Sequence, residues 1–287
     1  MNARIRRWAA IVLLAIAAPA IAQTSAQTFD SAGVPISYMD KGRGMPVVLI
    51  HGFTGSAARH WEAPGVMQAL ETAGYRVIAM DCRGHGQSGK PLDPAQYGFE
   101  MVRDVLRLLD HLKIDRAHVV GYSLGGAIAT QLLVGHPARL RAVTVLGAGW
   151  EGEDLTTFRS EILAMADGFA RRDVSGLFRA VSGSKEPTPE ELAAANESMF
   201  SRNDPQVLAA AARGMLPIWE VSAERLKAAT LPVLGIIGEL DNVAAVKRMA
   251  TVVRGMEVVI IPGADHRTSV KPSAAPLVAF LDKHRDR

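Results

Sequence analysis

Ser123 stands in a glycine-bracketed turn whose residue types could support covalent catalysis. The turn, Gly121–Gly125, lies between the apolar pair Val119-Val120 and the helix-forming residues Ala127–Ala129. A serine hydroxyl is a weak nucleophile unless a base and anion-stabilising donors are held beside it. A sharp strand-to-helix turn exposes the hydroxyl, and the two glycines make such a turn possible. The pattern predicts a nucleophilic serine, and the alternative is an ordinary glycine-rich turn.

A nucleophilic serine needs a histidine that accepts its proton and a carboxylate that orients this histidine. In a doubly wound sheet, functional groups follow the carboxyl ends of the strands. His266 meets this condition because it follows the apolar run 257–261 by one short turn. His51 also ends a strand, but it begins a glycine turn that is needed to stabilise the oxyanion. We interpret the following as ordinary packed or solvated histidines: His60, His111, His118, His136 and His284.

Asp241 is the predicted carboxylate. It lies three residues into the loop after the apolar run 233–237, where a side chain can turn back toward a histidine on a neighbouring strand. Glu239 in the same loop is the alternative. Asp265 is adjacent to His266 in sequence and cannot easily reach its ring. The resulting chain order of nucleophile, acid and base is the one this kind of sheet uses.

Two backbone N–H groups are predicted to stabilise a tetrahedral oxyanion. The first is that of Leu124, at the start of the helix after the serine, where amides are unpaired and the helix dipole favours negative charge. The second comes from the turn His51–Gly55, which follows a central strand, and we predict the amide of Phe53.

Apolar runs alternating with amphipathic helices predict the scaffold that positions these groups. Uninterrupted apolar runs indicate strands with both faces covered; they occur at 46–50, 76–80, 118–120, 142–146, 233–237 and 257–261. A hairpin is predicted within 28–40 and helices at 62–72 and 100–112. The alternation predicts an α/β fold with a doubly wound, mostly parallel sheet.

One interruption of this alternation, from Trp150 to Ala229, is helical in pattern throughout. Two of its helices begin with a capping residue followed by proline, at Thr188-Pro189 and Asp204-Pro205. An insertion of this length must lie over one end of the sheet, so we predict a cap that roofs a pocket. The alternative is a structural layer away from the site. Large apolar residues of the cap either line the pocket or pack it on the sheet: Trp150, Phe158, Met165, Phe169, Phe178, Met199, Phe200, Met215 and Trp219.

The first 22 residues have the features of a secretory signal peptide. Three arginines precede an apolar stretch, Trp8–Ala22, of 15 residues that ends in an Ala-x-Ala pattern. This stretch is shorter than the ~20 residues that span a bilayer. We expect its removal and a periplasmic or secreted protein with no stable membrane span; the alternative is a retained anchor. The predicted parts are a leader (1–22), a core (23–149 and 231–287) and a cap (150–230).

Charge and cysteine content limit the partners and the means of stabilisation. The chain has 32 Lys and Arg against 29 Asp and Glu, and three of the arginines lie in the leader, so the remaining chain is formally neutral. This balance gives no support to nucleic-acid binding. Cys82 is the single cysteine, so no intramolecular disulfide can form. An apolar core must hold the fold, and 48% hydrophobic residues suffice for one.

Five segments in this order resemble the successive signatures of the α/β-hydrolase superfamily: His51–Gly55, Asp81–Ser88, Gly121–Gly126, Gly238–Asp241 and Pro262–His266. The resemblance implies an eight-stranded sheet with a helical cap between strands six and seven, and no cofactor or metal. It also implies a structural role for the Asp81–Ser88 loop, so Arg83 and His85 are not expected to be catalytic. Members that use an aspartate nucleophile, such as epoxide hydrolases, are set aside because position 123 is serine.

The sequence therefore predicts an exported serine hydrolase that cleaves a small-molecule carboxylic ester with Ser123, His266 and Asp241. Lactones or carbon-carbon bonds are alternative substrates of the same triad, although carbon-carbon bond hydrolases more often have asparagine where this chain has Tyr122. A non-catalytic ligand-binding protein of the same fold is a further alternative. Fold alone does not name the reaction.

Overall fold

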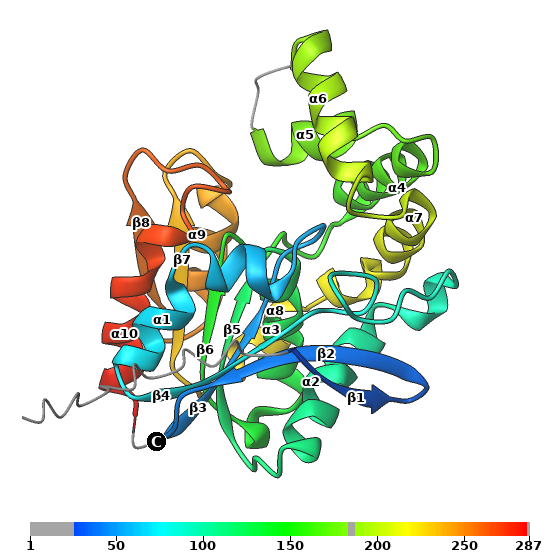
Figure 1. The fold of residues 1–287 in the computed structure, drawn as a ribbon. Coiled ribbons are helices and arrows are strands. Elements are labelled where there is room, and N and C mark those ends of the chain that lie inside the picture. The colour runs from blue at the N-terminus through cyan, green and yellow to red at the C-terminus, as the bar shows by residue number, and fades with distance from the viewer. Residues whose placement is uncertain (1–25, 183–186, 286–287) are drawn as a thin grey trace, which may run out of the picture.

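The computed structural model describes residues 26–182 and 187–285, so the predicted leader lies outside the described residues. Eight strands form one sheet in the order β1-β2-β4-β3-β5-β6-β7-β8 (Figure 1). Their bounds are β1 Gln27–Ser31, β2 Val34–Lys41, β3 Met45–Ile50, β4 Tyr75–Met80, β5 Ala117–Tyr122, β6 Leu140–Leu146, β7 Val233–Gly238 and β8 Glu257–Ile261. β2 pairs antiparallel with β1 and β4, and all other neighbours are parallel. The predicted fold class is confirmed.

The alternating side chains of the central strands enter two separate apolar layers. In β3, Val48 and Ile50 face one layer, whereas Val47 and Leu49 face the other, and all four are fully buried. This period of two on a strand with both faces covered explains why its sequence is uniformly apolar.

Helices cover both faces of the sheet. Helix α1 (Val66–Thr72) and helix α10 (Ala274–Lys283) pack on the face toward Val47. Helices α2 (Phe99–His111), α3 (Leu124–Gly135) and α9 (Val243–Val252) contribute to the layer on the opposite face. Short helical turns connect them: η1 Ala58–Glu62, η2 Pro94–Gln96, η3 Pro137–Arg139 and η5 Lys271–Ser273.

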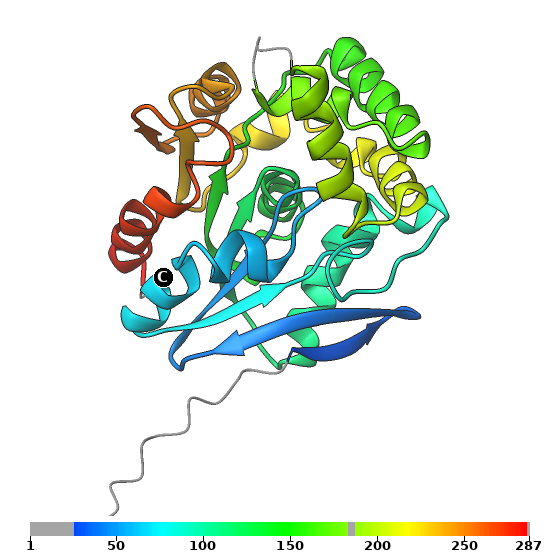
Figure 2. The ribbon, with the colours of Figure 1, turned by 45° about the horizontal axis from the view of Figure 1, so that its top comes forward.

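Residues 150–230, called here the helical insertion, run between β6 and β7. Its helices are α4 Thr156–Ala170, α5 Ser175–Ser182, α6 Pro189–Phe200, α7 Pro205–Gly214, η4 Leu216–Trp219 and α8 Ala223–Lys227. Thr188 and Glu191 form a capping box at the start of α6, and Asp204 caps α7, as their sequences predicted. Helices α4 to α7 stand beyond the ends of the central strands (Figures 1 and 2).

Two predicted elements need correction. The helix expected at 62–72 is interrupted: a π-helical turn ends at Glu62, and α1 starts at Val66 after Gly65, whose φ of 85° is left-handed. The run 257–261 was expected to be covered on both faces, but Ile260 is 38% exposed. β8 is the last strand of the sheet, and an apolar run does not reveal whether its neighbours extend over it. Among the described residues, no helix has the length and apolar character needed to cross a membrane.

Candidate active site

Four loops meet at one edge of the sheet because parallel strands end on the same side. Phe53 follows β3 and Ser123 follows β5. Asp241 follows β7 and His266 follows β8. The structure thus brings Ser123 and His266, which lie 143 positions apart in sequence, into contact.

Ser123 has a strained backbone conformation, in a turn where the neighbouring backbone segments pack closely together. Its φ of 54° and ψ of −114° are rare for a residue with a side chain. A Cβ on Gly121 would lie 1.9 Å from the carbonyl oxygen of Gly125, and a Cβ on Gly125 would lie 2.1 Å from that of Ile50. Both positions therefore require glycine, and their fit holds the serine at the start of α3.

A continuous hydrogen-bonded chain joins the three predicted side chains. His266 Nδ1 lies 2.8 Å from Asp241 Oδ2, and His266 Nε2 lies 3.1 Å from Ser123 Oγ. Because a carboxylate only accepts, Nδ1 carries the proton and Nε2 is free to accept the serine proton. His266 and Asp241 are only 13% and 10% exposed at their side chains, which shields the pair from water.

Neighbouring groups fix the histidine and the aspartate. The Tyr122 hydroxyl donates to the carbonyl of His266 at 2.9 Å, and the two rings lie 5.1 Å apart. The second oxygen of Asp241 accepts the backbone N–H of Asn242 at 2.7 Å. Tyr122, placed directly before the serine, therefore supports the base, a role that sequence reasoning missed.

The two alternative carboxylates are occupied elsewhere. Glu239 accepts the backbone N–H of Gly263 at 2.8 Å and so stabilises the turn after β8. Asp265 accepts from Thr268 and from the N–H of Arg267, which directs it away from the histidine ring. Of the three candidate carboxylates, Asp241 is the one in hydrogen-bonding contact with His266.

Phe53 and Leu124, whose backbone N–H groups are the predicted oxyanion donors, line the same cavity as Ser123. Within the described chain, neither N–H has a hydrogen-bond acceptor. The Gly52 carbonyl accepts from His51 Nδ1 at 2.7 Å and from the Gly55 N–H at 3.1 Å. The peptide bond between Gly52 and Phe53 is trans, so the Phe53 N–H points in the direction opposite to the Gly52 carbonyl.

Three histidines lie in or beside the turn His51–Gly55, and burial keeps them neutral. His51 is fully buried, and its Nε2 accepts the N–H of Cys82 at 2.9 Å; burial lowers its pKa to about 4. His60 Nδ1 accepts the Gly52 N–H at 3.2 Å. Burial is the main cause that lowers the pKa of His60 to about 3, and the neighbouring His51 adds to the shift. His85 packs 5.2 Å from the Phe53 ring, and its pKa is likewise lowered by burial to about 3.

His60 corrects the sequence interpretation, which gave it no place near the site. Its ring lies 4.9 Å from that of Tyr122, and it lines a cavity beside Ser123. A Cβ on Gly55 would lie 2.2 Å from this ring, so the glycine turn and the histidine fit each other. The His60-Trp61 pair after a glycine turn was the available signal, but it did not specify where η1 would place the ring.

Two cavities open at Ser123, and the helical insertion lines both. One of about 260 Å³ includes His60, Phe178 and Met199. The other, of about 240 Å³, includes Phe158, Met165, Met215 and Trp219. Most of the large apolar residues of the helical insertion therefore line the cavities. Phe169 and Phe200 are instead buried, and their rings lie 6.4 Å apart.

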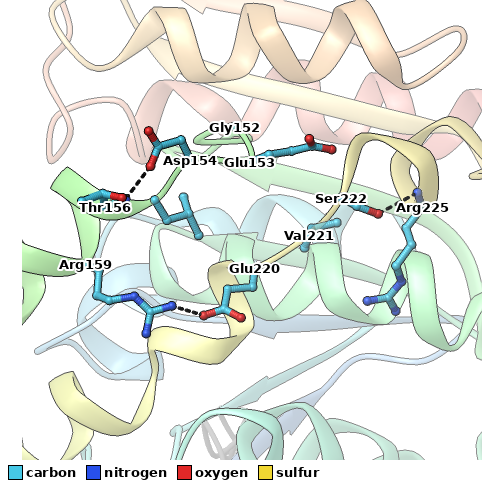
Figure 3. A pocket seen from close by; sticks show the side chains of 10 residues that line it. Gly152, Glu153, Asp154, Thr156, Arg159, Glu220, Val221, Ser222 and Arg225 are labelled. Carbon is cyan, nitrogen blue, oxygen red and sulfur yellow. Dashed lines mark hydrogen bonds and ion pairs between the residues drawn. The ribbon is translucent and has the colours of Figure 1, made fainter.

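A wider groove of about 810 Å³ lies at the stem of the insertion and holds none of the three triad side chains (Figure 3). Arg159 and Glu220 form an ion pair at 2.5 Å across it. In the part of the chain that the structure describes, no group of three His, Cys, Asp or Glu side chains is arranged to hold a metal ion. Cys82 is buried, and burial raises the pKa of its thiol.

Comparisons with known proteins identify the family. Residues 45–270 match the alpha/beta hydrolase fold family. The 2-hydroxymuconate semialdehyde hydrolase of Pseudomonas sp. (strain CF600) is 36% identical over 119 residues, which are 41% of this chain and 41% of that protein. The chain matches less than half the length of the first curated relatives found.

Solved structures show the same architecture over most of the chain. Epoxide hydrolase A from Mycobacterium thermoresistibile is 24% identical with a TM-score of 0.72, covering 90% of this chain and 98% of that one. An N-acyl homoserine lactone degrading enzyme is 28% identical with a TM-score of 0.65, covering 90% and 99%. With its eight-stranded sheet and a family match that spans most of its length, the chain belongs to the α/β-hydrolase fold family.

Proposed function

We propose that the chain is a serine hydrolase that cleaves a carboxylic ester through an acyl-enzyme intermediate. The observation that carries the proposal is the hydrogen-bonded chain from Asp241 through His266 to Ser123, at 2.8 and 3.1 Å. These distances lie within the range over which a base can take a proton from a nucleophile.

The proposed reaction has two halves. Ser123 Oγ attacks the ester carbonyl while His266 Nε2 takes its proton, and Asp241 stabilises the resulting imidazolium. The tetrahedral oxyanion lies against the amides of Phe53 and Leu124. His266 then gives the proton to the departing alkoxide, which leaves as the alcohol. Water, deprotonated by His266, attacks the acyl-serine and releases the acid.

Labelling with an alkyl fluorophosphonate tests this proposal. The native protein should form one adduct per chain and should hydrolyse short-chain para-nitrophenyl esters. Ser123→Ala should lose the adduct and about 10⁶-fold in kcat while keeping its circular dichroism and unfolding midpoint. A folded native protein that neither reacts nor turns over any ester of the panel would exclude the proposal.

A lactone is the second candidate substrate. The support is the 28% identity with an enzyme that degrades N-acyl homoserine lactones. A lactone is a cyclic ester, so the same steps open its ring and the alcohol stays attached to the acid. Comparing kcat/KM for lactones and open-chain esters of equal carbon number separates the two candidates.

We also propose that the protein is exported and loses residues 1–22. The support is the arginine-led apolar stretch that ends in Ala-x-Ala. Mass spectrometry of the protein from periplasm and medium should give a chain beginning near Gln23. Full-length protein in the membrane fraction would instead indicate a retained anchor.

A further inference from the structure

The two cavities beside Ser123 differ in charge. We call the one that contains His60 the basic compartment and the one that contains Trp219 the acidic compartment. Both include Phe53, Leu177, Ser123 and His266, so a bound ester would extend from the reacting atoms into either or both.

Three arginines from separate parts of the chain line the basic compartment. Arg59 comes from η1, Arg202 follows α6, and Arg267 follows the histidine of the triad. None of the residues that line this compartment is acidic. Positive charge therefore converges on one side of the nucleophile.

These three arginines have no carboxylate partner within ion-pair distance among the described residues, although Arg202 donates to the hydroxyl of Ser198 at 2.9 Å. Many arginines elsewhere pair with Asp or Glu: Arg76, Arg83, Arg103, Arg107, Arg139, Arg159, Arg213 and Arg285. Burial, together with the charge of Arg202, lowers the pKa of Arg59. Arg59 and Arg202 line the same cavity and both carry positive charge, so an anion bound between them would relieve their repulsion.

The acidic compartment has the opposite character. Glu151 and Glu161 line it together with Phe158 and Trp219. Burial raises the pKa of Glu151, and the nearby charge of Arg248 opposes this shift. An anionic group would be repelled from this side, so the charge difference between the compartments gives an ester one preferred orientation.

We propose that the substrate carries a carboxylate, which the basic compartment binds through Arg59 and Arg202, with Arg267 adding to the positive field. This inference rests on the proposed ester hydrolysis at Ser123 and names the substrate class. Guanidinium groups suit it because their planar N–H donors match the two oxygens of a carboxylate.

Two pairs of esters that differ only in charge test the inference. In the first pair, mono-para-nitrophenyl adipate carries the carboxylate on the acyl side, and para-nitrophenyl hexanoate replaces it with a methyl group. In the second pair, para-carboxyphenyl butyrate carries it on the alcohol side, and para-carbamoylphenyl butyrate is its neutral match. We expect kcat/KM of the native protein to favour the anion about tenfold in at least one pair. Added salt should reduce this preference.

The double variant Arg59→Gln/Arg202→Gln should lose the preference, and Arg202→Glu should reverse it. Arg171→Gln is the matched control, because Arg171 lies on the same insertion and lines neither compartment; it should leave the preference unchanged. Equal use of both members in both pairs by the native protein would overturn the inference while the proposed hydrolysis stands. A preference that survives in the double variant would also overturn it.

Binding measurements separate the two proposals if no ester is turned over. Calorimetric titration of Ser123→Ala with adipate should show binding that the added Arg59→Gln and Arg202→Gln changes weaken at least tenfold. Hexanamide, which lacks the charge, should bind equally to both proteins. Adipate binding that does not depend on these arginines would contradict the inference whatever the catalytic result.

Discussion

Two arginine–carboxylate pairs of equal length lie in very different surroundings. In the core, Arg83 meets Asp104 at 2.5 Å, and both side chains are essentially inaccessible, at 1% and 0% exposure. In the helical insertion, Arg159 meets Glu220 at 2.5 Å, but about half of each side chain is exposed. The core surrounds its charges with protein, whereas the insertion leaves them in water. The three triad residues follow strands β5, β7 and β8 of the core and not the helices of the insertion.

The buried pair offers the largest expected effect. Arg83 also donates to the carbonyl of Gln96, and Ser31 donates to Asp104, so the cluster links the loop after β4 with α2 and β1. Arg83→Gln should lower the free energy of unfolding by about 3–5 kcal/mol, because it leaves Asp104 charged and buried without its closest cationic partner. Urea unfolding measures this loss. A loss below about 1 kcal/mol would show that the core cluster behaves like a surface pair.

Acid should destabilise the core and leave the insertion's own contacts largely unchanged. His51 and His85 keep pKa values of about 4 and 3, below their ordinary value of 6.5, and none of the eight histidines falls within 150–230. Above pH 6.5 both histidines are neutral in the folded and in the unfolded chain. As pH falls toward 5, the unfolded chain binds protons that the folded chain cannot, so each histidine should cost about 2 kcal/mol.

The urea midpoint at about pH 5 should therefore be well below that at pH 7. His85→Gln should reduce this difference, since one of the buried histidines with a lowered pKa no longer titrates. An unchanged pH dependence in that variant would assign the effect to other groups.

The exposed pair offers the smallest effect. Arg159→Gln should change the free energy of unfolding by less than about 1 kcal/mol, as exposed ion pairs usually do. A double-mutant cycle with Glu220→Gln isolates the pair's own contribution. A coupling energy above about 2 kcal/mol would remove the contrast with Arg83 and Asp104.

Sequence reasoning predicted the features that follow from general rules of parallel sheets. Buried strands appear as apolar runs, and parallel strands end at one edge, so the positions of Ser123, Asp241 and His266 after β5, β7 and β8 followed from order alone. The structure brings these three side chains into hydrogen-bonding contact.

What the sequence did not predict depends on contacts between distant segments. His60 reaches the site because a π-helical turn directs its ring toward Gly52 and Tyr122, and no local pattern encodes that direction. The basic compartment needs Arg59, Arg202 and Arg267 together, and these come from three separate segments whose packing sets their proximity. The exposure of Ile260 likewise depends on the absence of a strand beyond β8 in the described sheet.

Hydrogen bonds join the two connectors of the insertion at its base. The indole N–H of Trp150, on the incoming connector, donates to the carbonyl of Val221, on the outgoing connector, at 2.8 Å. The two connectors thus leave the sheet as a closed stem, and whatever lies between them is a loop anchored at fixed ends. Doubling the length of such a loop changes its closure free energy by only about 0.6 kcal/mol. New linings for the two compartments can therefore arise between these anchors without disturbing the strand order beneath.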